Sequence, residues 1–385
     1  MTMTDEQTGA LDAVTRALAA GAEANDRSGA FPAEGIAQAH AAGLLTATVG
    51  TRYGGPGGGL AETVTILRAL GQGDPSVALI SSMTLIAHAL QDRRPTWPDS
   101  VYAQAVAESA ERPVLINALR VEPELGTPAR GGLPATTSRA VDGGWELTGR
   151  KIFSTGAPGL RWMVVYARTE DEPARVGSFL VRSDSPGITI EPTWDHLGLR
   201  ASRSDDVIFA GTPVPAEAVT PLAEPAAPGP PPAEQAPWNA LPIAAIYLGV
   251  AAAARDWLAR FLTERVPTSL GRPLATLPRF QEALGEIEAA QIAAWDLVTG
   301  LAARADAGDL GASAHAAIAK LTATRAAIGS VEQAVALIGN NALTRRNPLE
   351  RHLRDVLCAR VHTPQDDTVT TAAGRVAFAV IGFRS

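Results

Sequence analysis

A proline-rich stretch constrains the fold of this chain more than any other feature of its sequence. Residues 221–237 read P-L-A-E-P-A-A-P-G-P-P-P-A-E-Q-A-P. Because proline fixes φ and lacks a backbone N–H group, such a segment forms neither the interior of a helix nor a central strand. It is typical of an extended connection. We therefore expect separately folded regions before and after it.

Two regions of different character precede this connection. Residues 9–112 carry apolar side chains at helical spacing, beginning with Leu11 and Val14, which predicts a helical domain over 1–112. Residues 113–220 contain short apolar runs that are separated by glycine and proline turns. Short strands at this spacing indicate a compact all-β domain, which we expect to be a small β-barrel.

The region after the connection, residues 238–385, is helical again. Long alanine- and leucine-rich segments predict a C-terminal four-helix bundle. The expected helices are Leu241–Thr263, Phe280–Ala307, Ser313–Ile338 and Pro348–Ala359, followed by one with Thr363 as its N-cap. The alanine content indicates that some faces meet other subunits, so we expect a homo-oligomer such as a homotetramer. The predicted fold class is a multidomain α+β protein.

Charge and composition exclude several classes of function. The net charge of −7 argues against nucleic-acid binding, which depends on basic patches. The single cysteine, Cys358, excludes an internal disulfide and a thiolate metal cluster. No uninterrupted apolar run approaches the roughly 20 residues of a membrane span, and the N-terminus lacks the features of a signal peptide. We expect a cytoplasmic enzyme without a metal centre.

The most informative local stretch is Gly149–Pro158, which reads G-R-K-I-F-S-T-G-A-P. It lies between two apolar runs, which predicts a strand, a polar turn and a second strand. The turn carries the aromatic Phe153 and the hydroxyls of Ser154 and Thr155, which can contact a flat polar ring. An ordinary β-turn with a positive φ at Gly156 explains the same residues. The chain has no P-loop, G-x-S-x-G or H-E-x-x-H motif, so both interpretations stay open at this point.

Four separated segments resemble the acyl-CoA dehydrogenase superfamily of flavoproteins. Residues 119–127, L-R-V-E-P-E-L-G-T, are similar to the family's T-E-P-x-x-G-S loop, and residues 151–156, K-I-F-S-T-G, to its K-x-W-I-T-N turn. Residues 199–215 resemble G-x-R-x-S-x-T-x-x-V-x-F followed by V-x-V-P. Residues 347–355 resemble P-x-x-R-x-x-R-D. Together with the α, β, α layout, the resemblance covers nearly the whole chain.

The resemblance implies a flavin cofactor. In this family the first two loops hold the isoalloxazine ring of FAD, with FMN as the alternative in a monooxygenase. The cofactor contacts that it assigns are Val121, Thr127, Phe153, Ser154, Thr155, Gln281 and Gly339. A flat apolar cover with hydrogen-bond donors at the ring edge tunes the flavin's electronics. Two positions depart from the family pattern: Pro267 stands where an arginine is expected, with Arg265 nearby, and Asn340 follows Gly339.

The resemblance also implies α,β-dehydrogenation as the reaction, but the glutamate that serves as catalytic base in the family is absent at both expected positions. An acyl-CoA dehydrogenase removes the substrate's α-proton with a glutamate. The two positions that carry this glutamate in the family fall on Thr363 and Asn239, and neither is a carboxylate. The interpretation we favour from sequence is α,β-dehydrogenation of an acyl-CoA or similar thioester with a relocated base. Its electron acceptor would be an electron-transfer flavoprotein or O₂.

A monooxygenase on the same fold is the alternative. Such relatives bind reduced flavin and O₂, lack the glutamate and carry a histidine after the R-D segment. His362 is similarly placed, and His88 and Ser154 are the other candidate catalytic residues. The partner of such an enzyme would be a flavin reductase. A purely structural role remains open for both histidines. The third hypothesis is a flavin-binding protein that has lost catalytic activity.

Overall fold

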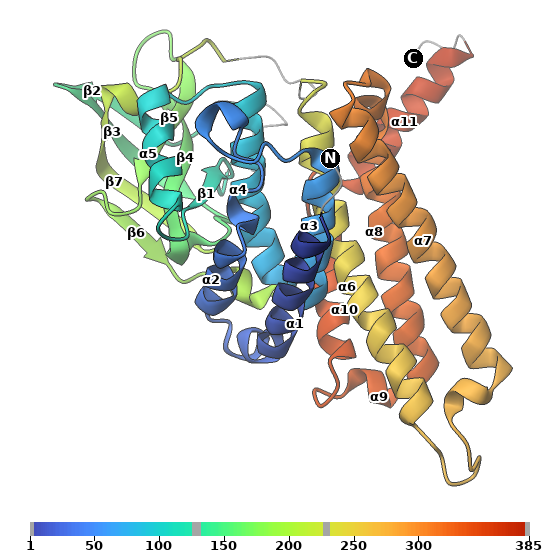
Figure 1. Cartoon of the computed structure of the whole chain (residues 1–385). Helices are drawn as coiled ribbons and strands as arrows, with labels where there is room; N and C mark the ends of the chain where they lie inside the picture. Colours follow the sequence, from blue (N-terminus) through green and yellow to red (C-terminus); the bar gives the residue numbers. More distant parts are fainter. Residues whose placement is uncertain (1–3, 125–131, 226–231, 382–385) are drawn as a thin grey trace.

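The computed structural model describes residues 4–124, 132–225 and 232–381. The chain forms an N-terminal helical part, a curled sheet and a C-terminal bundle of long helices, as Figure 1 shows. This arrangement confirms the predicted fold class. Of the predicted cofactor residues, Thr127 lies outside the described residues.

The N-terminal part packs around the buried helix α4. Its helices are α1 (Asp5–Ser28), α2 (Ala33–Ala41), α3 (Leu60–Gly73), α4 (Pro75–Arg93) and α5 (Asp99–Ser109), with the 3₁₀ turns η1 (Leu44–Thr46) and η2 (Thr51–Tyr53). A capping box between Thr4 and Gln7 starts α1. The carboxylate of Asp74 accepts from the N–H of Ser76 and starts α4. Helix α4 is buried on nearly every side, because both the sheet and the C-terminal bundle pack against it.

The middle part is one curled sheet. Its strands are β1 (Leu115–Leu119), β2 (Thr137–Val141), β3 (Gly144–Lys151), β4 (Leu160–Thr169), β5 (Val176–Arg182), β6 (Ile188–Glu191) and β7 (Asp206–Pro215). Within the described residues the strand order is β1-β4-β2-β3-β7-β6, and β5 pairs with β4. Short 3₁₀ turns interrupt the connections at η4 (Ala157–Gly159), η5 (Arg200–Ser202) and η6 (Ala216–Ala218). β3 is an inner strand of this order, and the turn that follows it lies against α4, where a Cβ at Gly156 would be 3.2 Å from Ile80.

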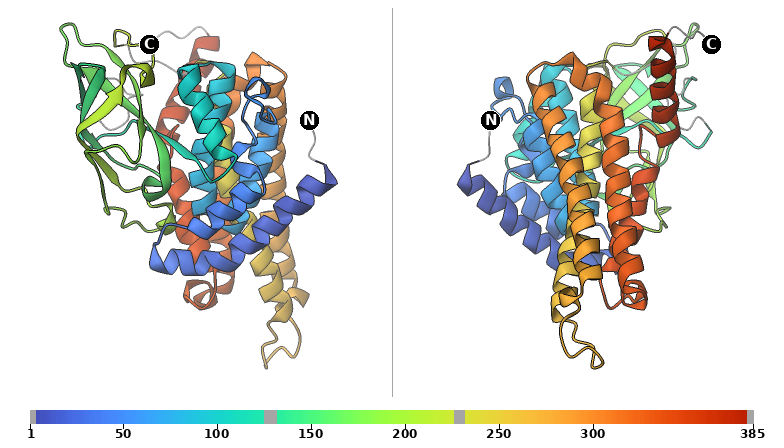
Figure 2. Two further views of the ribbon diagram at one scale, coloured as in Figure 1. Left: turned by 60° about the vertical axis from the view of Figure 1, so that its left-hand side comes forward. Right: turned by 90° about the vertical axis from the view of Figure 1, so that its right-hand side faces the viewer.

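Long helices form the C-terminal bundle. They are α6 (Ala236–Glu264), α7 (Pro278–Asp306), α8 (Leu310–Ile338), α9 (Asn340–Leu343), α10 (Leu349–Leu357) and α11 (Asp366–Val380), with η7 (Leu274–Thr276) and η8 (Cys358–Arg360). Figure 2 shows the α6–α7 connection extending beyond the rest of the molecule. Among the described residues, α6 is the one helix whose length and apolar composition would suffice to cross a membrane, and 83% of its most apolar window is buried inside the protein.

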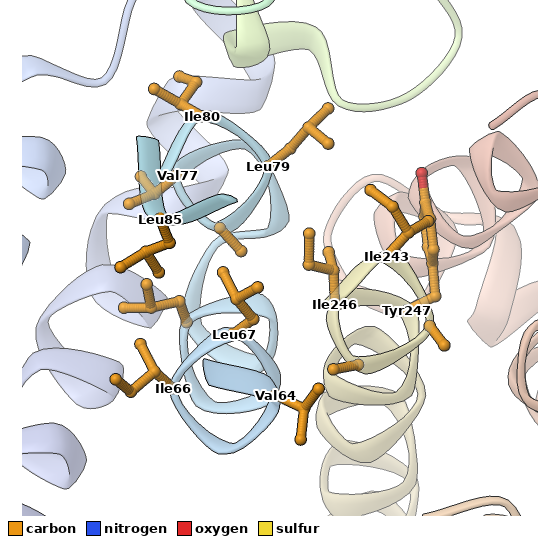
Figure 3. Packing of buried hydrophobic residues seen from close by; sticks show 14 of the residues in the cluster. Val64, Ile66, Leu67, Val77, Leu79, Ile80, Leu85, Ile243, Ile246 and Tyr247 are labelled. Atoms are coloured by element: carbon orange, nitrogen blue, oxygen red, sulfur yellow. The ribbon is translucent and has the colours of Figure 1, made fainter. Parts of the chain in front are cut away.

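Close backbone contact joins the bundle to the N-terminal part. A Cβ atom at Gly71 of α3 would lie 2.4 Å from the carbonyl oxygen of Ile246, and one at Gly249 of α6 would lie 2.2 Å from that of Arg68. Glycine is therefore required on both helices for them to approach this closely. Figure 3 shows the apolar residues of α3 and α4 packed against Ile246 and its neighbours on α6. This contact fixes α4 and α6 relative to each other.

The R-D segment of α10 joins all three parts of the chain. The guanidinium of Arg354 donates to both carboxylate oxygens of Asp26 on α1, at 2.8 and 2.6 Å, and to the carbonyl of Leu197 at 3.0 Å. The neighbouring carboxylate of Asp355 accepts from the N–H of Leu199 at 2.7 Å. Bidentate arginine–carboxylate pairs hold both partners in one geometry. The loop that precedes β7 is thereby held against the bundle.

Most helix boundaries of the bundle differ from the sequence-based prediction by one to five residues, and two of these differences have a clear physical cause. Helix α6 begins at Ala236, inside the predicted connection, because Trp238 is buried and stacks under the guanidinium of Arg93. Helix α11 begins at Asp366 rather than after Thr363. The carbonyls of residues 362 and 364 accept hydrogen bonds from the ammonium of Lys320 instead of from a helix turn.

Candidate active site

The turn after β3 is fixed by the two other segments of the family resemblance. The N–H of Ile152 donates to the carbonyl of Val121 at 3.0 Å. The N–H of Ser154 donates to the carbonyl of Asp205, and that of Gly156 to the carbonyl of residue 202. These bonds hold Phe153 at a φ of 54°, which is uncommon for a residue with a side chain. Such backbone strain clusters at ligand-binding sites.

Phe153 presents an aromatic surface at this turn. Its side chain is 53% exposed although it is large and apolar. Its ring lies edge-on to Trp194 at 6.4 Å and to His196 at 6.1 Å, and these two rings stack on each other at 3.6 Å. We name Phe153, Trp194 and His196 the aromatic cluster. Sequence reasoning missed Trp194 and His196, although they directly precede the segment that begins at Leu199.

Polar groups of the turn provide hydrogen-bonding capacity beside this cluster. The carbonyl of Thr155 accepts from the side-chain amide of Asn117, and its hydroxyl accepts from Ser204. Ser154 is only 1% exposed, and no described residue pairs with its Oγ. Buried polar atoms are nearly always paired in native proteins. An unpaired hydroxyl beside an exposed aromatic ring fits a turn that holds a planar polar ligand.

A buried ion pair supports the turn from behind. The ammonium of Lys151 donates to Glu122 at 2.6 Å and to the carbonyl of Tyr166 at 2.6 Å. Both ionised side chains are almost completely buried. The carboxylate of Glu122 also accepts from the N–H and hydroxyl of Thr136. Burial opposes ionisation of Glu122, but the hydrogen bonds from Lys151 and Thr136 outweigh it and lower its pKa. The pair ties the turn to the loop that carries Val121.

His88 lies on α4 as a neutral, buried imidazole. Its side chain is fully buried, and burial lowers its pKa to about 4. Nδ1 lies 2.8 Å from the hydroxyl of Tyr102, and no described residue pairs with Nε2. Burial raises the pKa of Tyr102 well above its usual range, so this hydroxyl stays protonated. The histidine therefore has one buried ring nitrogen without a partner among the described residues.

His362 is held by the bundle. Nδ1 lies 3.2 Å from the hydroxyl of Tyr247 on α6. The fully buried ammonium of Lys320 donates to the carbonyls of Ala359, His362 and Pro364 at 3.0 to 3.3 Å, which fixes the backbone around the ring. Burial, with a contribution from the charge of Lys320, lowers the pKa of His362 to about 4. This ring is therefore neutral at pH 7.

The three predicted catalytic residues lie on adjoining elements. A Cβ at Gly156 would lie 3.2 Å from Ile80, so the turn that carries Ser154 rests on α4, the helix of His88. Figure 3 shows Leu79 of α4 pointing to the side on which α6 carries Ile243 and Tyr247, the partner of His362. No direct contact between the three side chains occurs in the described structure. Their common use of one site is a proposal.

The two remaining cofactor residues lie at the end of the bundle. Gln281 is on the first turn of α7, and its amide donates to the carbonyl of Ala275. Gly339 ends α8 with a φ of 59°. The resemblance assigns Gly339 to the dinucleotide of a neighbouring subunit, and neither residue touches the turn after β3 in the described structure. Both assignments stay predictions.

The described residues offer no free buried carboxylate as a base. Every buried acid already has a partner in the structure: Asp74 with Asn25 and Ser76, Glu122 with Lys151, Asp205 with Arg203 and Trp194, Asp206 with Arg150, and Asp355 with Leu199. Asp366, close in sequence to Thr363, lies 3.3 Å from Arg325 and 3.9 Å from Lys320. The candidate catalytic side chains His88, His362 and Ser154 are thus two neutral imidazoles and a hydroxyl.

Comparisons with known proteins place this geometry in context. Three family models match most of the chain: acyl-CoA dehydrogenase N-terminal domain at residues 5–92, middle domain at 121–212 and C-terminal domain at 241–366. "Putative acyl-CoA dehydrogenase YdbM" of Bacillus subtilis is 33% identical over 92% of each chain. Amino sugar nitrososynthase DnmZ of Streptomyces peucetius is 28% identical, over 90% of this chain and 86% of its own length. The structure of KijD3 in complex with FMN and a dTDP-linked amino sugar has a TM-score of 0.78 at 26% identity, covering 100% of this chain and 96% of that one.

Proposed function

The chain belongs to the acyl-CoA dehydrogenase family, and we propose that it is a flavin-dependent oxidoreductase that transfers oxygen from O₂ to a small molecule. One observation carries this proposal. Where an acyl-CoA dehydrogenase needs a carboxylate base, the described site offers neutral imidazoles and a hydroxyl. The proposal therefore replaces dehydrogenation, which the sequence favoured, with the alternative.

The turn after β3 fits one face of a flavin. Phe153 would cover the ring, while Ser154 and Thr155 would bond its polar edge together with the backbone near Val121. When bound, the flavin supplies two-electron chemistry and reactivity toward O₂. Fewer residues would hold the adenosine half of FAD, because Pro267 stands where the family pattern has an arginine. These residues favour FMN, which KijD3 binds.

The chain's own residues would act as hydrogen-bond donors and proton carriers. A tyrosine hydroxyl that donates to Nδ1 leaves the imidazole proton on Nε2. Tyr102 and Tyr247 can serve His88 and His362 in this way, because burial raises the pKa of both hydroxyls. Each histidine would then present an N–H group without carrying a charge. The hydroxyl of Ser154 adds a third donor at the turn.

Dehydrogenation of an acyl-CoA is the second candidate function. The relative that is 33% identical over 92% of each chain carries the name of an acyl-CoA dehydrogenase, which favours it. A dehydrogenase would pass its electrons to an electron-transfer flavoprotein or to O₂, whereas the oxygenase would need a reductase that supplies reduced flavin. The two functions therefore predict different responses to thioesters and to O₂.

The first experiment compares these responses directly. The flavin-loaded protein is mixed with acyl-CoAs of several chain lengths without oxygen, and the flavin absorbance is followed. We expect no bleaching. Separately, reduced FMN bound to the protein is mixed with O₂, and we expect hydrogen peroxide to form more slowly than from free reduced FMN. Bleaching by any acyl-CoA, or peroxide release at the rate of free flavin, would contradict the proposal.

A variant pair tests the role of His362. His362→Asn should release peroxide about tenfold faster than the wild type, the effect of losing about 1.4 kcal/mol of stabilisation. His315 on α8 is exposed, so His315→Asn is the matched control and should behave as wild type. Equal rates in wild type and His362→Asn at unchanged flavin occupancy would remove this residue from the mechanism.

A further inference from the structure

A cleft opens where the three parts of the chain meet. It has a volume of about 550 Å³ and is lined by the end of α1, by Leu197 and Arg200 of the loop before β7, and by Arg345, Asn347, Pro348, Glu350, Arg351 and Arg354. Ligand sites in proteins usually have volumes of this size, about 300 to 1,000 Å³. None of the residues assigned to the flavin lines this cleft. It is therefore a separate site.

Each acidic residue of this cleft already has an arginine partner. Glu23 pairs with Arg27 on α1. Asp26 and Glu350 both pair with Arg354, at 2.6 and 2.8 Å. These pairs use Arg27 and Arg354 and leave no unpaired carboxylate among the residues that line the cleft. The remaining arginines determine its charge.

Arg351 is the unusual member of that set. Its side chain lines the cleft but is only 9% exposed. No hydrogen bond or ion pair joins its guanidinium to any described residue, and its Nε is fully buried. Burying a charge without a partner is costly, so native proteins supply a partner. Asp74 and Asp355 line a small inner cavity with Arg351 and interact with its charge, but neither carboxylate forms an ion pair with it.

Further positive charge faces the same cleft. Arg345 is exposed there, and its guanidinium has no ion pair among the described residues. Arg200 also lines the cleft, and its closest acid is the exposed Asp195 at 3.8 Å. The amide of Asn347 adds a neutral hydrogen-bonding group. The guanidinium of Arg200 is half-buried and donates to the carbonyls of Asp26 and His196, so Arg351 and Arg345 are the cleft arginines without an ion pair in the described part of the chain.

We propose that this cleft binds the phosphate group of a small molecule, with Arg351 as the buried anchor and Arg345 at the entrance. A guanidinium presents paired N–H groups that match the oxygens of a phosphate. The bound anion supplies the partner that Arg351 lacks. The volume leaves room for more than the phosphate itself, so inorganic pyrophosphate and a nucleoside diphosphate are the two sources to distinguish. The proposal does not depend on the reaction at the flavin.

Calorimetric titration of the flavin-loaded full chain tests this assignment. The probes are inorganic pyrophosphate and ADP, each at constant ionic strength, because unspecific attraction to arginines is screened by salt. We expect saturable binding of pyrophosphate. Tighter binding of ADP would identify a nucleotide as the ligand, and equal affinity would identify the free anion. Absence of saturable binding with both probes, or release of the flavin on titration, would overturn a separate phosphate site.

Three variants identify the residues responsible. Arg351→Gln and Arg345→Ala should each weaken binding by about tenfold or more, the effect of losing charge-assisted hydrogen bonds. Arg345 is exposed, so its replacement tests the site even if Arg351→Gln fails to fold. Arg346→Ala is the matched control, since Arg346 is exposed and does not line the cleft. An equal loss of affinity in Arg346→Ala would show that only general surface charge is involved and would refute the proposal.

Discussion

Asp355→Asn probes a buried carboxyl whose pKa is strongly raised. Asp355 is 3% exposed and accepts one hydrogen bond, from the N–H of Leu199 at 2.7 Å. Burial raises its pKa from its ordinary value near 4 to about 7, and the nearby acids Asp26 and Asp74 add to the effect. The charge of Arg351 opposes it. Asparagine keeps the acceptor oxygen for Leu199 but cannot ionise.

The sign of the effect follows from proton linkage. Because its pKa is higher in the folded state, Asp355 binds a proton more tightly there than in the unfolded chain. Its contribution to stability is fully present below about pH 4 and is lost as the pH rises through 7. A shift of about three units corresponds to roughly 4 kcal/mol as an upper bound. Asp355→Asn cannot ionise and keeps this contribution at every pH. As the pH rises from 5 to 8, the free energy of unfolding of the wild type should therefore fall by about 2 to 4 kcal/mol relative to that of the variant.

Urea unfolding of both proteins at pH 5, 6, 7 and 8 measures this difference. Other titrating groups cancel when the two free energies of unfolding are subtracted at each pH. Asp367→Asn, on the first turn of α11, is exposed and reports the effect of removing a surface carboxyl. If the difference between wild type and Asp355→Asn is the same at pH 5 and pH 8, the carboxyl ionises normally and the reasoning from burial fails.

Two further predictions concern the turn after β3. Lys151→Met should lower the free energy of unfolding by roughly 3 to 5 kcal/mol, because it leaves the carboxylate of Glu122 buried without its cation. Adding Glu122→Gln should restore part of this loss, and an additive double variant in urea unfolding would contradict the coupling. Thr155→Trp should remove the bound flavin by filling the space beside the ring, as measured by the flavin absorbance after gel filtration. Full occupancy in that variant would show that the ring lies elsewhere.

Local sequence signals were sufficient for the arrangement of helices and strands. Apolar spacing, glycine turns and the proline-rich connection determine secondary structure through residues that are close in sequence. They therefore predict helices and strands without knowledge of the tertiary structure. The start of α6 is different. Pro242 lies inside this helix and predicts a start close to it, yet burial of Trp238 extends the helix to Ala236. Tertiary packing thus overrides the local cost of proline.

The candidate site was only partly predictable for the same reason. The turn at Phe153 was found because its residues are adjacent in the chain. The hydrogen-bond partners of the histidines are not adjacent in the chain. Tyr247 and His362 are separated by 115 residues, and nothing in the sequence links them. The aromatic partners Trp194 and His196 likewise reach Phe153 only because the loop before β7 folds onto the turn. Burial of each ionisable group could not be known from residue types alone.

The environment of His362 distinguishes its two conceivable chemical roles. A base that removes an α-proton becomes an imidazolium, and the site must stabilise that charge. Burial and the ammonium of Lys320 do the opposite, since both lower the pKa of the ring to about 4. A ring that donates a hydrogen bond from Nε2 needs no change of charge, and the hydroxyl of Tyr247 at Nδ1 supports that tautomer. The same contacts that make His362 a poor replacement for the missing glutamate therefore suit it to stabilise an oxygen atom, which is why we favour oxygen transfer over dehydrogenation.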